Sequence, residues 1–240
     1  MASAAAHEVK ALVFDVFGTL VDWRASIARE ARDVLAPQGI ALDWEAFADA
    51  WRDQYQPAMD EVRTGRLPFS KLDVLHRRNL DAVLRNCGLD AVDEATRQHL
   101  NLAWHRLDAW PDVAAGLTRL RTRFRVAPCS NGNISLMVDL ARRNGFAWDA
   151  ILGAELARDY KPKAIVYLAA ASAFDCAPRE AMMVAAHSSD LHAAAAAGLR
   201  TAFIARPDEH GAGRGESHAS VAVDLSARSL GDLADQLGCR

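Results

Sequence analysis

Four short apolar runs, separated by stretches with helical periodicity, constrain the fold of this chain most strongly. They lie at residues 9–14, 124–130, 181–186 and 200–205, and a shorter run at 221–224 is a candidate fifth strand. Short apolar runs bounded by turn residues are typical of strands buried on both faces. Strands that alternate with helices indicate an α/β fold with a doubly wound, Rossmann-like parallel sheet.

The helices expected between these strands cover residues 112–122, 132–144, 163–174 and 190–197. Right-handed crossovers bring the carboxyl ends of parallel strands to one edge of the sheet. A ligand in such a fold binds outside those ends, so the site should be sought where the strands stop.

A second region, residues 24–106, carries no strand signal. It begins with an amphipathic helix that ends at Pro37–Gly39, and a further helix places Phe47, Trp51 and Tyr55 four residues apart. Two more helices are expected near 69–86 and 93–107. We therefore expect residues 8–22 and 107–240 to form the catalytic core and residues 23–106 to form a helical cap inserted after the first strand. The aromatic stripe is either ordinary packing or the wall of a dry pocket.

Composition excludes several classes of protein. The 240 residues are 51% hydrophobic and 25% charged, with a formal net charge of −3 and no basic stripe, which argues against nucleic-acid binding. No apolar run is long enough for a membrane span, and the first residues lack the features of a secretory signal. The cysteines are scattered and are expected to be free thiols in a reducing cytoplasm; they are Cys87, Cys129, Cys176 and Cys239. A polar loop without periodicity covers 206–220.

Polar groups follow each expected strand end. They are Asp15 and Thr19 after the first strand, Ser130 and Asn131 after the second, Lys161 in the loop at 159–162, and His187 and Asp190 after the third. An acid directly after an apolar strand is costly to desolvate without a reason. Taken singly, the other groups have ordinary interpretations as helix caps or solvated loop residues.

Taken in order, these groups resemble the four motifs of the haloacid dehalogenase superfamily. The motifs stand here as "FDVFGTLVD", "SNGN", "KPKAIVY" and the acid of "HSSD". The chain is most similar to the type II, or L-2-, haloacid dehalogenases. That similarity rests on "SN" in the second motif, on Lys161 and Pro162 followed by Tyr167, and on Trp51 and Arg52 in the second cap helix.

Phe17 distinguishes two chemistries within this superfamily. The phosphatases and mutases of the superfamily that this chain resembles typically use a second acid two residues after the first, which protonates the leaving alkoxide. A halide leaves without a proton, so Phe17 at that position favours cleavage of a carbon–halogen bond. Asp190 behind "HSS" makes a poor site for Mg²⁺, and we expect no metal and no other cofactor.

The resemblance implies a mechanism. Asp15 attacks the α-carbon of a small 2-haloacid, expels the halide and forms an aspartyl ester. Lys161 orients Asp15, Thr19 braces it, and Asp190 positions the water that hydrolyses the ester to a 2-hydroxy acid of inverted configuration. The implied substrate- and halide-binding residues are Arg52, Ser130, Asn131, Phe17, Tyr167 and His187, with the substrate carboxylate at the helix that follows Ser130–Asn131. Tyr167 either supports Lys161 or is a plain core residue, and similar proteins form homodimers through their cap helices.

His187 departs from the family pattern. Relatives commonly carry Ser-x-Asn before the last acid, whereas Ala185, Ala186 and His187 stand here. His187 could hydrogen-bond Asp190 or line a halide pocket suited to fluoride, act as a general base, or be purely structural. Three other functions stay open at this point: a Mg²⁺-dependent phosphatase, a hydrolase of another activated carbon electrophile, and a non-catalytic scaffold.

Overall fold

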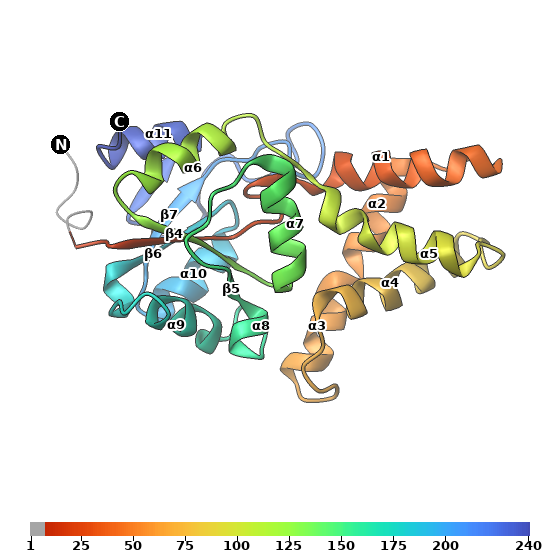
Figure 1. The fold of residues 1–240 in the computed structure, drawn as a ribbon, viewed down its shortest axis with the longest axis horizontal. Coiled ribbons are helices and arrows are strands. Elements are labelled where there is room, and N and C mark those ends of the chain that lie inside the picture. Colours follow the sequence, from red (N-terminus) through yellow and green to blue (C-terminus); the bar gives the residue numbers. More distant parts are fainter. Residues whose placement is uncertain (1–7) are drawn as a thin grey trace. The chain divides into compact units, whose positions relative to one another are not determined.

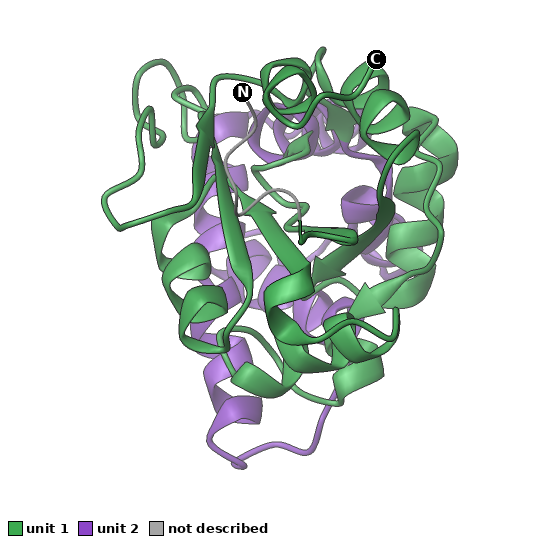
Figure 2. Cartoon of the chain, turned by 90° about the vertical axis from the view of Figure 1, so that its left-hand side faces the viewer, with its two compact units in different colours: residues 1–22, 108–240 green, residues 23–107 purple. Residues whose placement is uncertain are grey.

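A computed structural model describes residues 8–240 as two compact units. One unit contains the described residues up to Asp22 together with Asp108–Arg240, and the other is Trp23–Leu107 (Figure 2). The second unit is therefore an insertion between two segments of the first.

The first unit is built on a parallel six-stranded sheet (Figure 1). Its order is β5-β4-β1-β6-β7-β8. The bounds are β1 Ala11–Phe14, β4 Arg125–Ser130, β5 Leu152–Gly153, β6 Ala181–Ala185, β7 Arg200–Ile204 and β8 Leu225–Ala227. The expected doubly wound α/β fold is confirmed. The chain order reverses at β1, and in open α/β sheets this switch point is where ligands bind.

Helices cover both faces of this sheet. In Figure 1, α6 and α11 lie above it and α9 and α10 below it. The helices of this unit are α6 Val113–Arg121, α7 Ile134–Asn144, α8 Ala154–Ala157, α9 Ala164–Ser172, α10 Ser188–Ala196 and α11 Leu230–Gln236. Val13, Met183 and Phe203 of three strands pack in one core cluster with Val166 and Leu191 of α9 and α10. Burial on two faces explains why the strands are apolar throughout.

Two details of the sheet differ from the sequence-based expectation. The last strand is Leu225–Ala227 rather than 221–224, because the Asp224 carboxylate accepts hydrogen bonds from the backbone and the hydroxyl of Thr201 and so ends the preceding turn. Strand β5 is too short to carry a periodic signal, and its pairing with Cys129 and Ser130 is a tertiary contact.

A two-stranded antiparallel ribbon marks the ends of the insertion. β2, Val21–Asp22, pairs with β3, Asp108–Ala109. The chain leaves the first unit and re-enters it through these paired strands, so an insertion of this length leaves the parallel sheet intact.

The inserted unit is helical and has its own aromatic core. Its elements are α1 Trp23–Leu35, the 3₁₀ turn η2 Ala36–Gln38, α2 Trp44–Asp53, α3 Tyr55–Arg63, α4 Leu72–Asn86, α5 Glu94–Asn101 and the 3₁₀ turn η3 Leu102–Arg106. Phe47, Trp51 and Tyr55 are all buried inside this unit, although Tyr55 begins a separate helix. Trp51 Nε1 donates to the backbone oxygen of His76 at 3.0 Å. The stripe is thus core packing.

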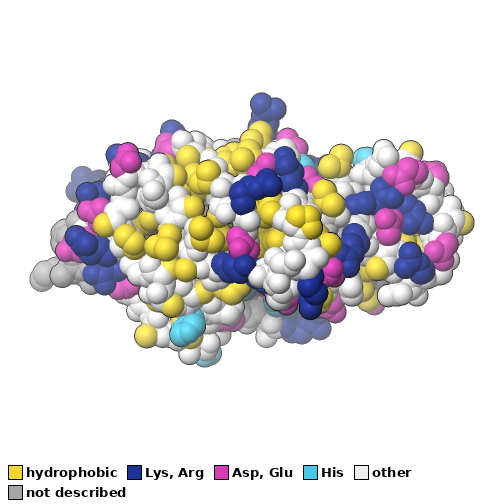
Figure 3. Space-filling view, turned by 90° about the horizontal axis from the view of Figure 1, so that it is seen from below, with side chains coloured by type: hydrophobic (Ala, Val, Ile, Leu, Met, Phe, Trp, Pro, Cys, Tyr) yellow, Lys and Arg dark blue, Asp and Glu magenta, His cyan; other side chains and the backbone are white. Residues whose placement is uncertain are grey.

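The surface of the first unit exposes apolar side chains along α8 and α9. Leu156, Ile165 and Leu168 are exposed there, and hydrophobic side chains gather over this part of the face seen in Figure 3. Among the helices of residues 8–240, none combines the length and the apolar character that a bilayer span requires.

Candidate active site

Asp15 is the centre of the polar cluster at the carboxyl edge of the sheet. It directly follows β1, and its backbone N–H donates to Val184 of β6 at 3.0 Å. Its side chain is in the interior, since only 7% of the residue surface is exposed. Lys161 Nζ lies 2.9 Å from Oδ1, while Thr19 Oγ1 and His187 Nδ1 lie 2.7 and 3.0 Å from Oδ2.

These partners keep Asp15 ionised. Burial alone would raise the pKa of a carboxyl group. The charge of Lys161 and the hydrogen bond from His187 outweigh burial and hold the pKa of Asp15 far below its usual range. The result is a carboxylate with little water around it, which is the form required of a nucleophile.

Lys161 connects Asp15 to the second acid, Asp190. Its Nζ lies 2.5 Å from Asp190 Oδ2 as well as 2.9 Å from Asp15 Oδ1, and the residue is 6% exposed. Burial would lower the pKa of this ammonium, but the two carboxylates raise it well above its usual value. The Lys161 backbone N–H donates to Asn131 Oδ1 at 2.9 Å, which fixes the loop that carries the ammonium.

Tyr167 lies fully buried in α9, close to both Asp190 and Lys161. Its hydroxyl donates to Asp190 Oδ1 at 2.5 Å. Burial and the neighbouring carboxylate raise the pKa of Tyr167, so the phenol stays a donor. Tyr167 therefore orients Asp190 from the side opposite Lys161.

The turn after β4 differs from the expected helix start. Helix α7 begins at Ile134 rather than at residue 132, because Asn133 has an extended backbone with φ −73° and ψ 162°. Ser130 Oγ accepts the Gly132 N–H at 3.0 Å and closes the turn. Glu155 accepts the first helical N–H, that of Ile134, at 2.8 Å. An anion would therefore meet the Ser130–Asn131 turn and not the helix end itself.

Phe17 is buried beside this turn. A Cβ placed on Gly132 would lie 3.4 Å from the Phe17 ring. The second position of the first motif thus presents an apolar ring toward the second motif, and no acid.

His187 lies between two carboxylates. Its Nδ1 faces Asp15 at 3.0 Å, and its Nε2 lies 3.0 and 2.8 Å from the two oxygens of Glu209. Burial would lower the pKa of His187, but the hydrogen bonds to Asp15 and Glu209 raise it to about 10. The hydrogen-bond partners of the His187 ring are therefore Asp15 and Glu209, whereas the sequence suggested Asp190 as a partner.

Glu209 is a site residue that the sequence analysis did not identify. It comes from the loop after β7 and is only 2% exposed. The same loop is fixed at two further points: Arg206 donates to the Thr19 carbonyl at 2.8 Å, and Glu216 accepts from the backbone and hydroxyl of Ser188. A glutamate in an aperiodic polar loop gives no signal of burial. The only sequence hint is Gly18, whose missing side chain leaves room for the Glu209 carboxylate.

We expect Gly18→Ala to destabilise the protein more than Gly39→Ala. Both glycines have left-handed φ values, +84° and +80°, but only at Gly18 would a Cβ collide with Glu209, while Gly39 faces open space. Each substitution carries the backbone cost of about 1–2 kcal/mol, and Gly18→Ala adds the clash. Urea unfolding of the two variants measures the difference. Equal unfolding free energies would mean that Glu209 moves away at no cost.

Arg52 lies in α2 of the helical unit. Its guanidinium carbon is 4.1 Å from the centre of the Tyr55 ring and 5.3 Å from that of Trp23. Such stacking keeps a cation fixed on aromatic faces while its N–H groups stay directed to the side.

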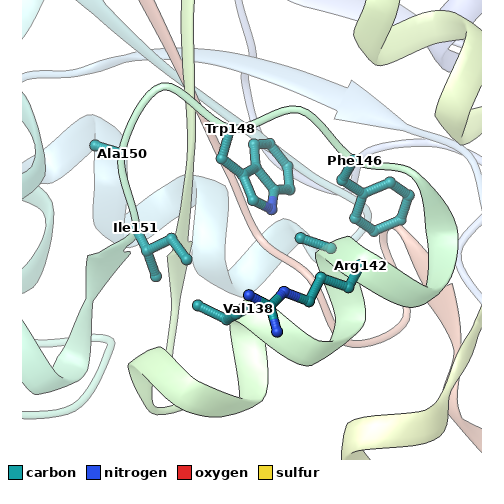
Figure 4. A pocket seen from close by; sticks show the side chains of 7 residues that line it. Val138, Arg142, Phe146, Trp148, Ala150 and Ile151 are labelled. Atoms are coloured by element: carbon teal, nitrogen blue, oxygen red, sulfur yellow. The ribbon is translucent and has the colours of Figure 1, made fainter.

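A separate cavity of about 280 Å³ lies between α7 and the segment that follows it. It is lined by Val138, Ala141, Arg142, Phe146, Trp148, Ala150 and Ile151, with Arg142 stretched along α7 below the Phe146 and Trp148 rings (Figure 4). None of the expected site residues lines it. Within residues 8–240, no group of three or more His, Cys, Asp and Glu side chains is arranged to hold a metal ion.

Comparison with known proteins identifies the family. A family model described as haloacid dehalogenase-like hydrolase matches residues 9–198. (S)-2-haloacid dehalogenase 1 of Pseudomonas sp. (strain CBS-3) is 30% identical over 201 residues, which are 82% of this chain and 85% of that protein.

Two solved structures are similar over almost their whole length. The defluorinating L-2-haloacid dehalogenase Rha0230 is 44% identical, with a TM-score of 0.95 over 100% of this chain and 99% of the other. The L-2-haloacid dehalogenase PA0810 is 47% identical, with a TM-score of 0.92 over 96% and 99%. These matches and the described fold show that the chain belongs to the haloacid dehalogenase-like hydrolases.

Proposed function

We propose that this protein hydrolyses short 2-haloalkanoic acids, such as haloacetates and 2-halopropanoates, to 2-hydroxy acids without a metal ion. One observation carries the proposal. Asp15 is a buried, ionised carboxylate held by the Lys161 ammonium, with the apolar Phe17 where a phosphatase would need an acid. The three similar proteins described above are named 2-haloacid dehalogenases, which supports the same substrate class.

In the first step, Asp15 attacks the α-carbon from the side opposite the halogen. A carboxylate oxygen forms the new C–O bond while the carbon–halogen bond breaks and its electron pair leaves with the halide. The halide needs no proton, which agrees with the apolar environment of Phe17. We propose that Arg52 receives the halide and that the Ser130–Asn131 turn binds the substrate carboxylate.

In the second step, water hydrolyses the aspartyl ester. Asp190, oriented by Lys161 and Tyr167, accepts a proton from the water that attacks Asp15 Cγ. The bond between Cγ and the ester oxygen then breaks, the alkoxide takes up that proton, and the 2-hydroxy acid leaves. The second water proton is lost from the Asp15 carboxyl group to solvent, which restores the carboxylate. Displacement occurs once at the α-carbon, so its configuration is inverted.

The donor set around Asp15 does not fit the alternative of a Mg²⁺-dependent phosphatase. Magnesium takes carboxylate oxygens and keeps several waters. Here Asp15 Oδ1 and Asp190 Oδ2 both accept from Lys161, and the other Asp15 oxygen accepts from Thr19 and His187. We therefore retain no metal in the proposed reaction.

Halide release should be insensitive to a chelator. We expect chloroacetate, fluoroacetate or 2-chloropropanoate to be turned over at the same rate with excess EDTA and with added Mg²⁺, because Lys161 supplies the cation at Asp15. Ion chromatography of the released halide measures this, with a phosphate monoester as the control substrate. Turnover that requires Mg²⁺, or phosphate release that EDTA suppresses, would contradict the proposal.

The assembly state is proposed on family resemblance. We propose a homodimer formed through the cap helices, as in similar proteins. Light scattering of the purified chain measures its mass directly, and the mass of a monomer would exclude the dimer.

A further inference from the structure

The two oxygens of Asp15 have different hydrogen-bond partners, and this difference assigns their roles. Oδ1 accepts one bond, from Lys161, while Oδ2 accepts two, from Thr19 and His187. An oxygen that accepts two hydrogen bonds is stabilised more than one that accepts a single hydrogen bond, and it is therefore the weaker nucleophile of the pair. Oδ1 is therefore the attacking atom, and Oδ2 becomes the carbonyl oxygen of the ester.

The second step then places negative charge on Oδ2. Water adds to Cγ, its proton passes to Asp190, and the electron pair of the carbonyl bond moves onto Oδ2. We propose, on the basis of the function proposed above, that His187 and Thr19 form the oxyanion hole for ester hydrolysis and that Glu209 is the positioning residue that keeps His187 doubly protonated. When the intermediate collapses, that electron pair re-forms the carbonyl bond, Oδ1 leaves with the product, and the water oxygen stays in Asp15.

Thr19 is preset as a donor. Its Oγ1 accepts the backbone N–H of Ala186 at 2.9 Å, so its own hydrogen is directed to Asp15 Oδ2. Donors that are oriented before the charge develops stabilise an oxyanion without reorganising, and the loss of one typically lowers the rate on the order of 10²–10³-fold.

His187 is preset as a cation. The groups that face it are the Asp15 carboxylate on one ring nitrogen and the Glu209 carboxylate on the other, with His210 beyond Glu209 at 3.7 Å and Lys161 on the far oxygen of Asp15. A ring between two acceptors must carry both protons to satisfy them. Both N–H groups are then in use, so this ring neither deprotonates water nor donates to a departing halide.

The loop after β7 holds Glu209 in place. Glu209 is buried against Gly18, and its neighbours Arg206 and Glu216 are bonded to Thr19 and Ser188. The same loop that orients His187 is therefore attached to the segments carrying Asp15 and Asp190. The Glu209 carboxylate faces the imidazole that contacts the proposed nucleophile, which a purely structural role of this buried acid does not require.

Rapid-quench kinetics with chloroacetate test the proposal with Glu209→Gln and His187→Gln. We expect the halide burst to stay within about threefold of wild type, because Oδ1 and Lys161 are unchanged, while ester hydrolysis falls on the order of 10²-fold. The ester should accumulate on the Asp15 peptide and be seen by mass spectrometry. Asp208→Asn, which removes an exposed acid from the same loop, is the matched control and should behave as wild type.

The pH dependence of ester hydrolysis distinguishes an electrostatic role of His187 from a purely structural one, because a purely structural role would not change the pH profile. In wild type, ester hydrolysis should fall at alkaline pH, where His187 loses its proton, while the halide burst does not. The pKa of His187 is about 10 while Asp15 is ionised, and the alkaline limb of ester hydrolysis should lie below that value because esterification removes the charge of Asp15. In Glu209→Gln that alkaline limb should move to still lower pH, because the Glu209 carboxylate, which still raises the His187 pKa in the ester form, is gone. The wild-type profile tests the proposal even where a variant fails to fold.

The outcomes separate the two proposals. Failure of ¹⁸O from the solvent to enter wild-type Asp15 in a single turnover would overturn the proposed function. An ester that forms normally and is hydrolysed at the wild-type rate in both variants would overturn only the oxyanion hole. A halide burst that slows as much as hydrolysis would place His187 in the first step instead and would also overturn it.

Discussion

Asp15→Asn should reduce haloacid turnover on the order of 10⁴-fold or more, the scale seen when a covalent nucleophile is removed. The amide lacks the charge that attacks the α-carbon, and it replaces a buried ion that Lys161, Thr19 and His187 surround. Halide release under saturating chloroacetate measures the loss. Asp208→Asn, an exposed acid elsewhere in the first unit, should retain wild-type activity.

Isotope labelling tests the nucleophilic role proposed for Asp15 in the wild-type protein, so the result does not depend on whether a variant folds. In a single turnover of wild type in ¹⁸O water, the label should enter the Asp15 side chain and not the first equivalent of 2-hydroxy acid, because the product takes Oδ1. Label found in that first product would show direct attack by water on the substrate. It would remove the nucleophilic role proposed for Asp15.

Lys161→Met should be the most disruptive single change among the site residues for stability as well as activity. It leaves Asp15 and Asp190 buried without the ammonium that lies between them. Breaking a buried ion pair by removing one partner costs about 3–5 kcal/mol. Urea unfolding at pH 7 measures this cost. Lys163→Met is the matched control, since its ion pair with Asp159 is largely exposed and should be worth less than about 1 kcal/mol.

The pKa of Asp15 sets how stability and activity change as pH falls, in wild type and in Lys161→Met. In wild type the pKa of Asp15 is lower in the folded than in the unfolded protein, so its contribution to stability is present at neutral pH and is lost as pH falls below the unfolded value of about 4. Without Lys161, burial raises the Asp15 pKa, so the loss of halide release on the acidic side of the pH profile should begin at a higher pH. An unchanged acidic side of that profile would mean that His187 alone keeps the pKa of Asp15 low.

Much of the fold could be predicted from local patterns. The apolar runs before Asp15, Ser130 and His187 are strands buried on both faces, and such strands have a distinctive composition. Parallel pairing then brings their ends together, which is why Asp15, Lys161 and Asp190 meet in the structure. The short strands β5 and β8 were missed or misplaced because two or three residues carry no period and their pairing depends on distant neighbours.

The side-chain contacts within the site were less predictable than the strand ends that carry it. For Tyr167 the sequence left open whether it supports Lys161 or only packs in the core, and it gave no sign of the hydrogen bond from its hydroxyl to Asp190, which Lys161 also contacts. Glu209 lies in a segment of Gly, Ser and charged residues that gives no signal of burial. Its contact with His187 depends on where the loop after β7 returns to the sheet.

The sequence by itself predicted the proposed nucleophile Asp15, its cation Lys161, the second acid Asp190 and the missing acid at Phe17, because each is tied to a strand end or a motif of fixed spacing. Only the tertiary structure decided which groups His187 contacts. Its protonation depends on Asp15 and Glu209, which are far from each other along the chain, and the fold brings one to each side of the ring. Local patterns encode which groups a segment presents, but the charge of a buried group depends on neighbours that only the folded chain supplies.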